Sequence, residues 1–516
     1  MSISLDIYNQ IKQMNITINN RVSNKSSVAC LIDNAGWNAK LSLSFQQRQQ
    51  MENGVKELSQ KLAIGHKVYG ITQGFGPLVQ FDASSSSFDQ GMGLISHLAA
   101  GQGKPLTQDV TRLMLWLRLQ GMTHGHSAVS PDSWIKLAEL WNRGFTPVVP
   151  QDGSVSASGD LVPLAHAALA FAGIGEVWSS SADSGWTRIP AKKALSALNV
   201  EPVILPAREA LAFVNGTTAS LAVACHNYQS IYTMARALAA LSGRIAYLLG
   251  VNYEPYTEKI SSVRGQPGQI LAAKWIRAEL TTKRQVKESR PLQEPYSLRC
   301  TPQVIGAIID HLNLQGSILV NEAQGCTDNP VIVDGELLHG GNFHALEVAL
   351  CSDQQTLCLH QLAFLAERQL AILLNPEYNG GKPPMLTDNP GPKSGLAGVQ
   401  IAATSFVSKI RQLSYPATLT PLPTNLGNQD HVPMALNGAN VLSETIQLAW
   451  LVVGSLGLAL NQWTHLEQVG STSGTVWEEL QTMFKPLETD LPLAGDVRQA
   501  AKLIENAASC WLSNED

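Results

Sequence analysis

The chain has 516 residues, 44% of them hydrophobic, which is enough to bury a large core and to form two or three domains. Its net charge of −5 offers no basic surface for nucleic acid, and the longest apolar stretch, 448–460, is too short to span a bilayer. The N-terminus lacks an apolar signal core, and seven cysteines without a CxxC pair are typical of reduced cytoplasmic thiols. Twelve histidines without metal-ligand spacing give little support for a metal site. We therefore expect a cytoplasmic protein that binds neither nucleic acid nor a membrane.

The predicted elements change in character along the chain. Residues 1–200 are rich in turns and glycine and are assigned to an N-terminal domain. In 201–516, the segments 207–249, 356–374 and 441–463 carry apolar residues at helical spacing with few charges, which predicts the helices of a bundle. A small hairpin is predicted around Asp334-Gly335, and the Pro/Gly-rich segment 375–395 is expected to be an ordered functional loop. The fold class is therefore mostly α.

The first segment with chemical potential is YGITQGFG, which begins at Tyr69. Its glycines permit a mobile, tightly turned loop, and the phenol offers a proton-transfer group. An unperturbed phenol has a pKa of about 10, so a site that uses it as a base near neutrality must stabilise the phenolate. The alternative is a buried aromatic residue beside a flexible turn.

The most informative segment is GSVSASGDLVPLAH at 153–166. If the amide nitrogen of Gly159 attacks the carbonyl of Ala157, the backbone closes into a five-membered ring. Loss of water from the ring and from Ser158 then leaves an electron-poor exocyclic alkene, an electrophile that no ordinary side chain supplies. The alternative is a polar turn before a helix, with Asp160 near its first turn.

Several later segments contain polar or aromatic residues in loop-like contexts. They are NGT at 215–217, QEPYSLR at 293–299, TDNP at 327–330, HGGNF at 339–343 and NLGNQD at 425–430. Taken singly they are ordinary turn sequences. Arg299 is suited to a carboxylate, because its planar guanidinium can bind both oxygens.

Together these segments, in this order from Tyr69 to Asp430, closely resemble the aromatic amino acid ammonia-lyase and aminomutase family, which includes the histidine, phenylalanine and tyrosine ammonia-lyases. The resemblance implies an elongated helical bundle of the fumarase/aspartase-like fold with a smaller mixed N-terminal domain. It also implies a homotetramer with shared active sites. The expected prosthetic group is 4-methylidene-imidazol-5-one formed from Ala157-Ser158-Gly159, with no external cofactor and no metal.

The resemblance also implies roles for single residues. Tyr69 would remove the β-proton of an amino acid substrate, and Asn215 would hydrogen-bond the ring carbonyl, as in an oxyanion hole. The expected substrate-binding and ring-contacting residues are Gln293, Tyr296, Arg299, Asn329, Phe343, Asn428 and Gln429. The substrate amine would attack the electrophile and become a better leaving group, and elimination would release ammonia and a trans-cinnamic-type acid.

Substrate choice depends on His97-Leu98, within GLISHLAAGQG. Tyrosine ammonia-lyases resemble one another in a His-Leu pair here, whereas the phenylalanine enzymes tend to have Phe-Leu. Histidine enzymes carry a Ser-His pair one residue closer to the glycine, and a Glu where Gln429 stands. A histidine can hydrogen-bond a phenol, so L-tyrosine is the leading substrate. A catechol such as 3,4-dihydroxy-L-phenylalanine would satisfy the same histidine.

Some positions depart from the family pattern. Ser156 stands where glycine is commoner, Gln324 lies in EAQG in place of ELNS, and Gln266 begins QPGQ in place of HPGQ. The alternatives are a histidine or phenylalanine ammonia-lyase, a tyrosine 2,3-aminomutase, or a non-catalytic scaffold that kept the fold. The intact tripeptide, Tyr69 and Arg299 argue against the scaffold.

Overall fold

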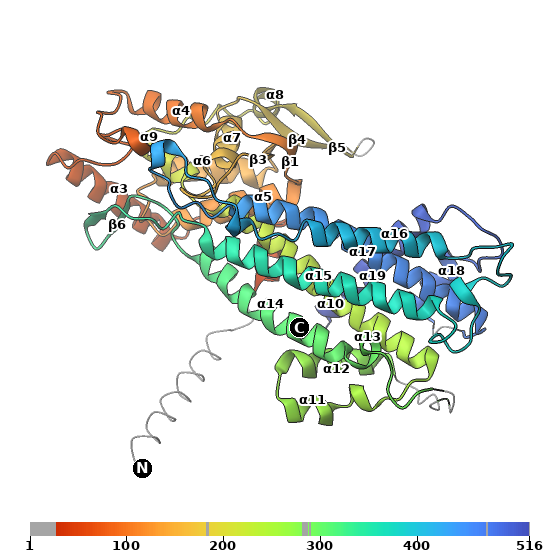
Figure 1. Cartoon of the computed structure of the whole chain (residues 1–516). Helices are drawn as coiled ribbons and strands as arrows, with labels where there is room; N and C mark the ends of the chain where they lie inside the picture. Colours follow the sequence, from red (N-terminus) through yellow and green to blue (C-terminus); the bar gives the residue numbers. More distant parts are fainter. Residues whose placement is uncertain (1–26, 182–184, 281–286, 288–289, 471–472, 515–516) are drawn as a thin grey trace, which may run out of the picture. The chain divides into compact units, whose positions relative to one another are not determined.

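The structure is a computed structural model, and it describes residues 27–181, 185–280, 287, 290–470 and 473–514 (Figure 1). The chain divides into two compact units. Unit 1 comprises the described parts of Met1–His226, Gly316–Val348 and Leu422–Leu436, and unit 2 those of Asn227–Gln315, Ala349–Pro421 and Asn437–Asp516. The sequence predicts domains of 1–200 and 201–516, whereas each unit combines three segments. The reason is that two late segments pack with the first part of the chain, so no single cut separates the units.

Unit 1 combines short helices with small antiparallel sheets. β1 pairs with β3, β4 lies between β2 and β5, and β6 and β7 form the hairpin predicted around Asp334-Gly335. Polar N-caps begin several helices: the Ser86 side chain accepts from the backbone N–H of Asp89, and Thr107 and Ser130 act in the same way. Its elements are α2 (Val28–Asn34), α3 (Phe45–Ala63), η1 (Gly76–Leu78), α4 (Ser87–Leu98), β1 (Gln102–Pro105), α5 (Gln108–Met122), α6 (Pro131–Asn142), β2 (Thr146–Pro147), β3 (Pro150–Asp152), α7 (Leu161–Phe171), β4 (Glu176–Ser181), β5 (Gly185–Pro190), α8 (Ala191–Ala197), α9 (Ala207–Val214), β6 (Val331–Val333), β7 (Glu336–Leu338) and η5 (Asn425–Gly427).

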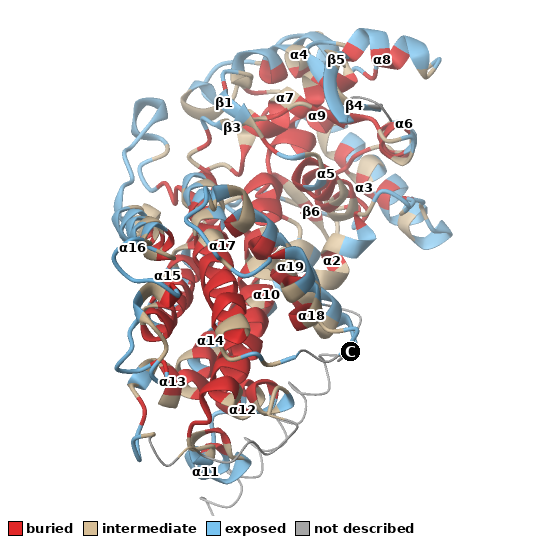
Figure 2. Ribbon diagram, turned by 90° about the vertical axis from the view of Figure 1, so that its right-hand side faces the viewer, coloured by how far each residue is buried: buried red, intermediate tan, exposed pale blue. Residues whose placement is uncertain are grey.

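Unit 2 is a bundle of long helices around one apolar core. The helices α10, α15 and α17 supply many of its fully buried side chains, among them Leu238, Leu362 and Leu456. α15 and α17 run side by side in Figures 1 and 2, and Figure 2 shows the buried faces in red. The helices that lie in this unit or extend into it are α10 (Thr218–Leu249), η2 (Glu254–Tyr256), α11 (Glu258–Arg264), α12 (Pro267–Ala278), α13 (Tyr296–Arg299), α14 (Thr301–Gln324), α15 (Leu346–Leu374), η3 (Pro384–Leu386), α16 (Ala397–Gln412), η4 (Ala417–Leu419), α17 (Ala435–Leu466), α18 (Val476–Met483) and α19 (Ala494–Ser513).

The prediction of a mostly α fold with a helical bundle and a mixed N-terminal unit is confirmed. The mixed unit is not the smaller one, because it also takes in the segments 316–348 and 422–436. The predicted helix 207–249 is interrupted at Asn215–Thr217 and forms α9 and α10. The predicted bundle helices 356–374 and 441–463 extend further at their N-terminal ends, because packing continues helices beyond the periodic core of the pattern.

Two described helices, α15 and α17, are long and apolar enough to cross a membrane by length and composition alone. In each, 67% of the most apolar window is buried inside the protein. Both helices contribute to the unit 2 core, and such core helices meet the same criterion as membrane spans. The apolar character of these helices is therefore explained by the bundle.

Candidate active site

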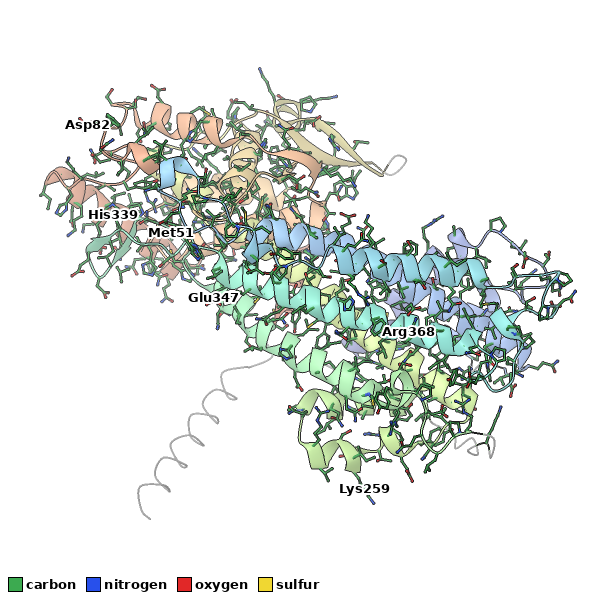
Figure 3. All side chains as sticks on the ribbon, in the orientation of Figure 1. Met51, Asp82, Lys259, His339, Glu347 and Arg368 are labelled. Carbon is green, nitrogen blue, oxygen red and sulfur yellow. The ribbon has the colours of Figure 1, made fainter. Side chains whose placement is uncertain are left out.

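A cavity of about 1280 Å³ lies in unit 1 and gathers most of the predicted site residues. Its walls come from the loop 67–83, from α4, from the Ser158 turn, from the end of α9 and from two late loops. Asp82 and His339, labelled in Figure 3, line it from two of these loops. The predicted residues that line it are Tyr69, His97, Leu98, Ser158, Asn215, Asn329, Phe343, Asn428 and Gln429. Segments far apart in the sequence, from Lys67 to Gln429, thus share one space.

The tripeptide sits in a tight bend between β3 and α7. Ala157 and Gly159 form an isolated bridge across Ser158, and Ala157 is buried. Gly159 has a φ of +70°, and a Cβ added there would lie 2.5 Å from the backbone nitrogen of Gly216. Only glycine fits this backbone and this close approach. The chain therefore turns tightly at Ser158, with Ala157 and Gly159 bridged across it.

Two side chains from separate segments of unit 1 hydrogen-bond to Ser158. Asn215 Nδ2 donates to the Ser158 carbonyl oxygen at 2.7 Å, and Gln429 Nε2 donates to the Ser158 hydroxyl at 2.9 Å. Asn215 is placed there because α9 ends at Val214 and the chain turns before α10. Its buried Oδ1 has no hydrogen-bond partner among the described residues. Both donors polarise the groups that would react.

Asp160 holds this bend in place through hydrogen bonds. The sequence analysis did not predict it as a site residue. It is fully buried, and its carboxylate accepts from Ser154 Oγ at 3.0 Å, Ser156 Oγ at 2.7 Å, and the backbone N–H and hydroxyl of Ser220 at 2.7 and 2.8 Å. Burial raises the pKa of Asp160, and these hydrogen bonds oppose the shift only in part. The signal was present, because Asp160 directly follows Gly159, but a helix-start interpretation explained it equally well.

Ser156, a departure from the family pattern, gains a structural explanation. It has a φ of +56°, a conformation in which glycine is less strained than serine. Its hydroxyl donates to Asp160 and accepts from the backbone N–H of Leu436 at 3.1 Å. These bonds offset the backbone strain and tie the bend to the start of α17.

Tyr69 lies on the cavity wall within its glycine-containing loop. Its hydroxyl accepts from the backbone N–H of Gly76 at 2.8 Å, and its own N–H donates to His339 Nε2 at 3.3 Å. The ring of Phe75 meets it edge-on at a centroid distance of 6.0 Å. Burial raises the pKa of Tyr69, while the Gly76 hydrogen bond lowers it in part. Near neutral pH, Tyr69 is therefore protonated in most molecules, and the phenolate, where it forms, is a strong base.

His97 lies in the last turn of α4 and faces the cavity. Its Nδ1 is 3.0 Å from the carbonyl oxygen of Gly93, one turn earlier in the helix. Because a carbonyl oxygen only accepts, Nδ1 must carry the proton. In the neutral ring Nε2 then has a free lone pair, so His97 can accept a hydrogen bond from a ligand.

A buried charge cluster fixes the late loops. Asp328 pairs with Arg208, and Arg118 lies 4.0 Å from the same carboxylate. Asp328 also accepts from the backbone N–H of Asn329 at 2.7 Å, and Asn329 Oδ1 accepts from Gly340 N at 2.7 Å. The loops that carry Asn329 and Phe343 are thereby joined. Sequence analysis did not single out either arginine, since an isolated Arg is usually a surface charge.

The remaining predicted residues, Gln293, Tyr296 and Arg299, belong to unit 2, at and before α13. They are absent from the described lining of the cavity. Tyr296 is 71% exposed, and the Arg299 guanidinium lies 4.8 Å from the centroid of its ring. No group of three or more His, Cys, Asp or Glu residues in the described part of the chain is arranged to hold a metal ion.

Comparison with known proteins shows the family of the chain. The family model described as aromatic amino acid lyase matches residues 26–485. Tyrosine aminomutase from Streptomyces globisporus is 27% identical, with a TM-score of 0.85 over 93% of this chain and 95% of that one. Histidine ammonia-lyase from Trypanosoma cruzi is 26% identical, with a TM-score of 0.83 over 93% and 92%. Phenylalanine ammonia-lyase from Rhodosporidium toruloides, 23% identical, shares the fold with a TM-score of 0.75 over 94% and 84%. The chain is therefore an enzyme of the aromatic amino acid lyase family.

Proposed function

We propose that Ala157, Ser158 and Gly159 cyclise to 4-methylidene-imidazol-5-one and that the enzyme eliminates ammonia from L-tyrosine. In ring formation the Gly159 nitrogen bonds to the Ala157 carbonyl carbon. The Ala157 carbonyl oxygen leaves as one water with the hydrogens of the Ser158 and Gly159 nitrogens, and the Ser158 hydroxyl leaves as a second with the α-hydrogen of Ser158. The tight bend and the φ of +70° at Gly159 support this step. Once formed, the group supplies an electrophilic alkene to the substrate amine.

The surrounding residues fit that group. Asn215 Nδ2 already donates to the Ser158 carbonyl, which becomes the carbonyl of the ring. Gln429 contacts the hydroxyl that must leave, and with Asn428 it is positioned to contact the amine afterwards.

Tyr69 takes the β-proton of the substrate in this proposal. Its hydroxyl lines the same cavity as Ser158, and the Gly76 N–H donates to it and so favours the phenolate. Asn329 is expected near the carboxylate, with Phe343 against the ring of the prosthetic group. Proton removal and amine departure at adjacent carbons leave the trans-cinnamic-type acid.

The substrate carboxylate is best bound by an arginine, whose guanidinium can bind both oxygens, and no arginine is among the described lining residues of the cavity. Among the described lining residues, Lys67 is the only lysine or arginine. We infer that Arg299, with Gln293 and Tyr296, acts across a subunit boundary in a homotetramer. The cytoplasm is the proposed location, since seven cysteines without a CxxC pair are typical of reduced cytoplasmic thiols.

The substrate assignment depends on one observation, the hydrogen bond from His97 Nδ1 to Gly93 O. It leaves Nε2 as an acceptor, which pairs with a phenol O–H and finds no partner on a phenylalanine ring. A catechol offers the same donor. An imidazole N–H could also donate, but the amide of Gln429 replaces the carboxylate expected of histidine enzymes.

The test compares the wild type with His97→Phe and His97→Gln. Each is incubated with tyrosine, dihydroxyphenylalanine, phenylalanine and histidine, and the product absorbance is followed. We expect coumarate and caffeate from the wild type, a shift toward cinnamate in His97→Phe, and retained tyrosine preference in His97→Gln, whose amide oxygen still accepts. A urocanate band from the wild type would mean that the substrate is histidine.

A second candidate is a tyrosine 2,3-aminomutase, favoured by the similarity to the Streptomyces globisporus enzyme. The same residues would eliminate ammonia and then return it to the β-carbon. Chromatography of the products decides between the two: β-tyrosine accumulation identifies the mutase, and coumarate without β-tyrosine identifies the lyase.

A further inference from the structure

His166 makes a contact that none of the roles above uses. It lies on α7, and its Nε2 accepts a hydrogen bond from the backbone N–H of Gly101 at 3.0 Å. Because a backbone N–H only donates, this nitrogen must hold a lone pair, so the ring is neutral with its proton on Nδ1. Burial lowers the pKa of His166, which favours that neutral form.

Gly101 follows the end of α4, which carries His97, and it contacts the elements next to the tripeptide bend. It lies four residues after His97, and it precedes β1. A Cβ added to Gly101 would lie 2.8 Å from Pro150 Cγ, 3.0 Å from Val162 Cγ1 and 3.2 Å from the Asp152 carbonyl oxygen. Its backbone therefore packs directly against β3 and the first turn of α7, the two elements that flank the bend.

Gly153, which faces Gly101 from the tripeptide segment, also approaches it closely. A Cβ added to Gly153 would lie 3.2 Å from Gly101 Cα, and the neighbouring Gln102 pairs with Asp152 in the β1–β3 ladder. Helix α4 has already ended at Ala99, whose dihedrals are non-helical (φ −77°, ψ 60°). The His166 bond is thus a hydrogen bond that joins the non-helical segment after His97 to the helix that begins next to Ser158.

We propose that His166 is a positioning residue that sets the distance between His97 and the electrophile at Ser158. It rests on the proposed function, because it assigns His166 to substrate selection at the same site. The amine and the ring hydroxyl lie at opposite ends of a tyrosine substrate, and the flat ring fixes the direction of the hydroxyl from the β-carbon. A small displacement of His97 along that direction therefore breaks the hydroxyl contact while the amine is still bound.

The test is a pair of substitutions at one position. His166→Phe keeps the ring shape and removes the acceptor, whereas His166→Gln places an amide oxygen near the position of Nε2. The measured quantity is the ratio of kcat/KM for tyrosine to that for phenylalanine. We expect His166→Phe to lower this ratio about tenfold and His166→Gln to retain it within about threefold. The near-ultraviolet absorbance of the prosthetic group should be unchanged in both.

A structural role would give a different result. Equal loss with both substrates, or loss of the prosthetic-group absorbance, would mean that His166 only supports folding of α7, and an unchanged ratio would overturn the proposal. If His166→Phe does not fold, His166→Asn replaces it, since its shorter amide falls short of Gly101 N. A wild type without preference for a ring hydroxyl refutes the proposed substrate independently of every His166 variant.

Discussion

Both units bury apolar side chains, and they differ in where their buried polar groups lie. Unit 1 encloses charged groups, with Asp160 and Asp328 fully buried beside serine hydroxyls and arginines. The core of unit 2 is a continuous apolar set, mainly Leu, Ile, Val and Ala with several Trp, from long helices. Its buried Arg290–Glu294 ion pair is not among the described lining residues of the cavity. Apolar burial is non-directional, whereas a buried carboxylate is stable only with its partners in place. Unit 1 therefore uses polar networks to fix loop geometry, and unit 2 gains stability from packing.

This contrast predicts that substitutions in unit 1 change chemistry more than stability, and that those in unit 2 do the opposite. The most severe test is Ser158→Ala, which removes the leaving hydroxyl and so prevents formation of the electrophile. We expect activity to fall by at least about 10³-fold with unchanged thermal unfolding. Activity and the near-ultraviolet absorbance of the prosthetic group are measured, with Ser196→Ala on the surface of α8 as the matched control. Substantial activity in Ser158→Ala would disprove the prosthetic-group proposal.

Tyr69→Phe should have the next largest effect. Loss of the base is expected to lower kcat by about 10²–10³-fold and to leave the prosthetic-group absorbance intact. Burial raises the pKa of Tyr69 above its usual value, and the deprotonated form is the active one, so wild-type kcat/KM should rise with pH through the alkaline range. A pH–rate profile checks this, and the rise should be missing in Tyr69→Phe. The same slope in both proteins would exclude Tyr69 as the base.

Leu362→Ala tests the other side of the comparison. Leu362 on α15 is fully buried in the unit 2 core, so its truncation should lower the free energy of unfolding by about 2–4 kcal/mol. The prosthetic group should still form, because the tripeptide belongs to unit 1. The control is Leu357→Ala on the same helix, 59% exposed in the chain, with an expected change below about 0.5 kcal/mol. Sedimentation of both variants detects any effect on assembly.

The smallest effect is expected at a unit 2 ion-pair site. Burial alone would raise the pKa of Glu467, but hydrogen bonds and charge from Lys382 and Lys287 outweigh it and lower the pKa to about 2. A depressed carboxyl pKa stabilises the fold above the unfolded value of about 4.3, and this stabilisation is lost as pH falls toward 2. Glu467→Gln should therefore cost about 1 kcal/mol at pH 7 and progressively less below pH 4.

Urea unfolding at several pH values measures this difference. The control is Glu444→Gln, because Glu444 forms an exposed ion pair with Lys409. This substitution should change the free energy of unfolding by less than about 0.5 kcal/mol at any pH. A destabilisation by Glu467→Gln that grows as the pH falls would contradict a depressed pKa at this carboxyl.

Local chemistry could be predicted from the sequence. Three consecutive residues are enough to show that the backbone could close into a ring, and helical spacing was enough to find the bundle segments that became α10, α15 and α17. The hairpin at Asp334-Gly335 was equally local, since both residues adopt positive φ in the structure. Each of these features depends on neighbours within a few positions.

The tertiary structure alone decided which distant residues meet. Gln429 reaches Ser158 across 271 positions, and Arg208 reaches Asp328 across 120. The discontinuous units, the anchoring of Asp160 and the His166–Gly101 bond likewise depend on packing between separate segments. The physical reason is burial: a sequence pattern shows that a residue can carry a charge or a lone pair. Only the folded chain shows which partner remains when water has been excluded.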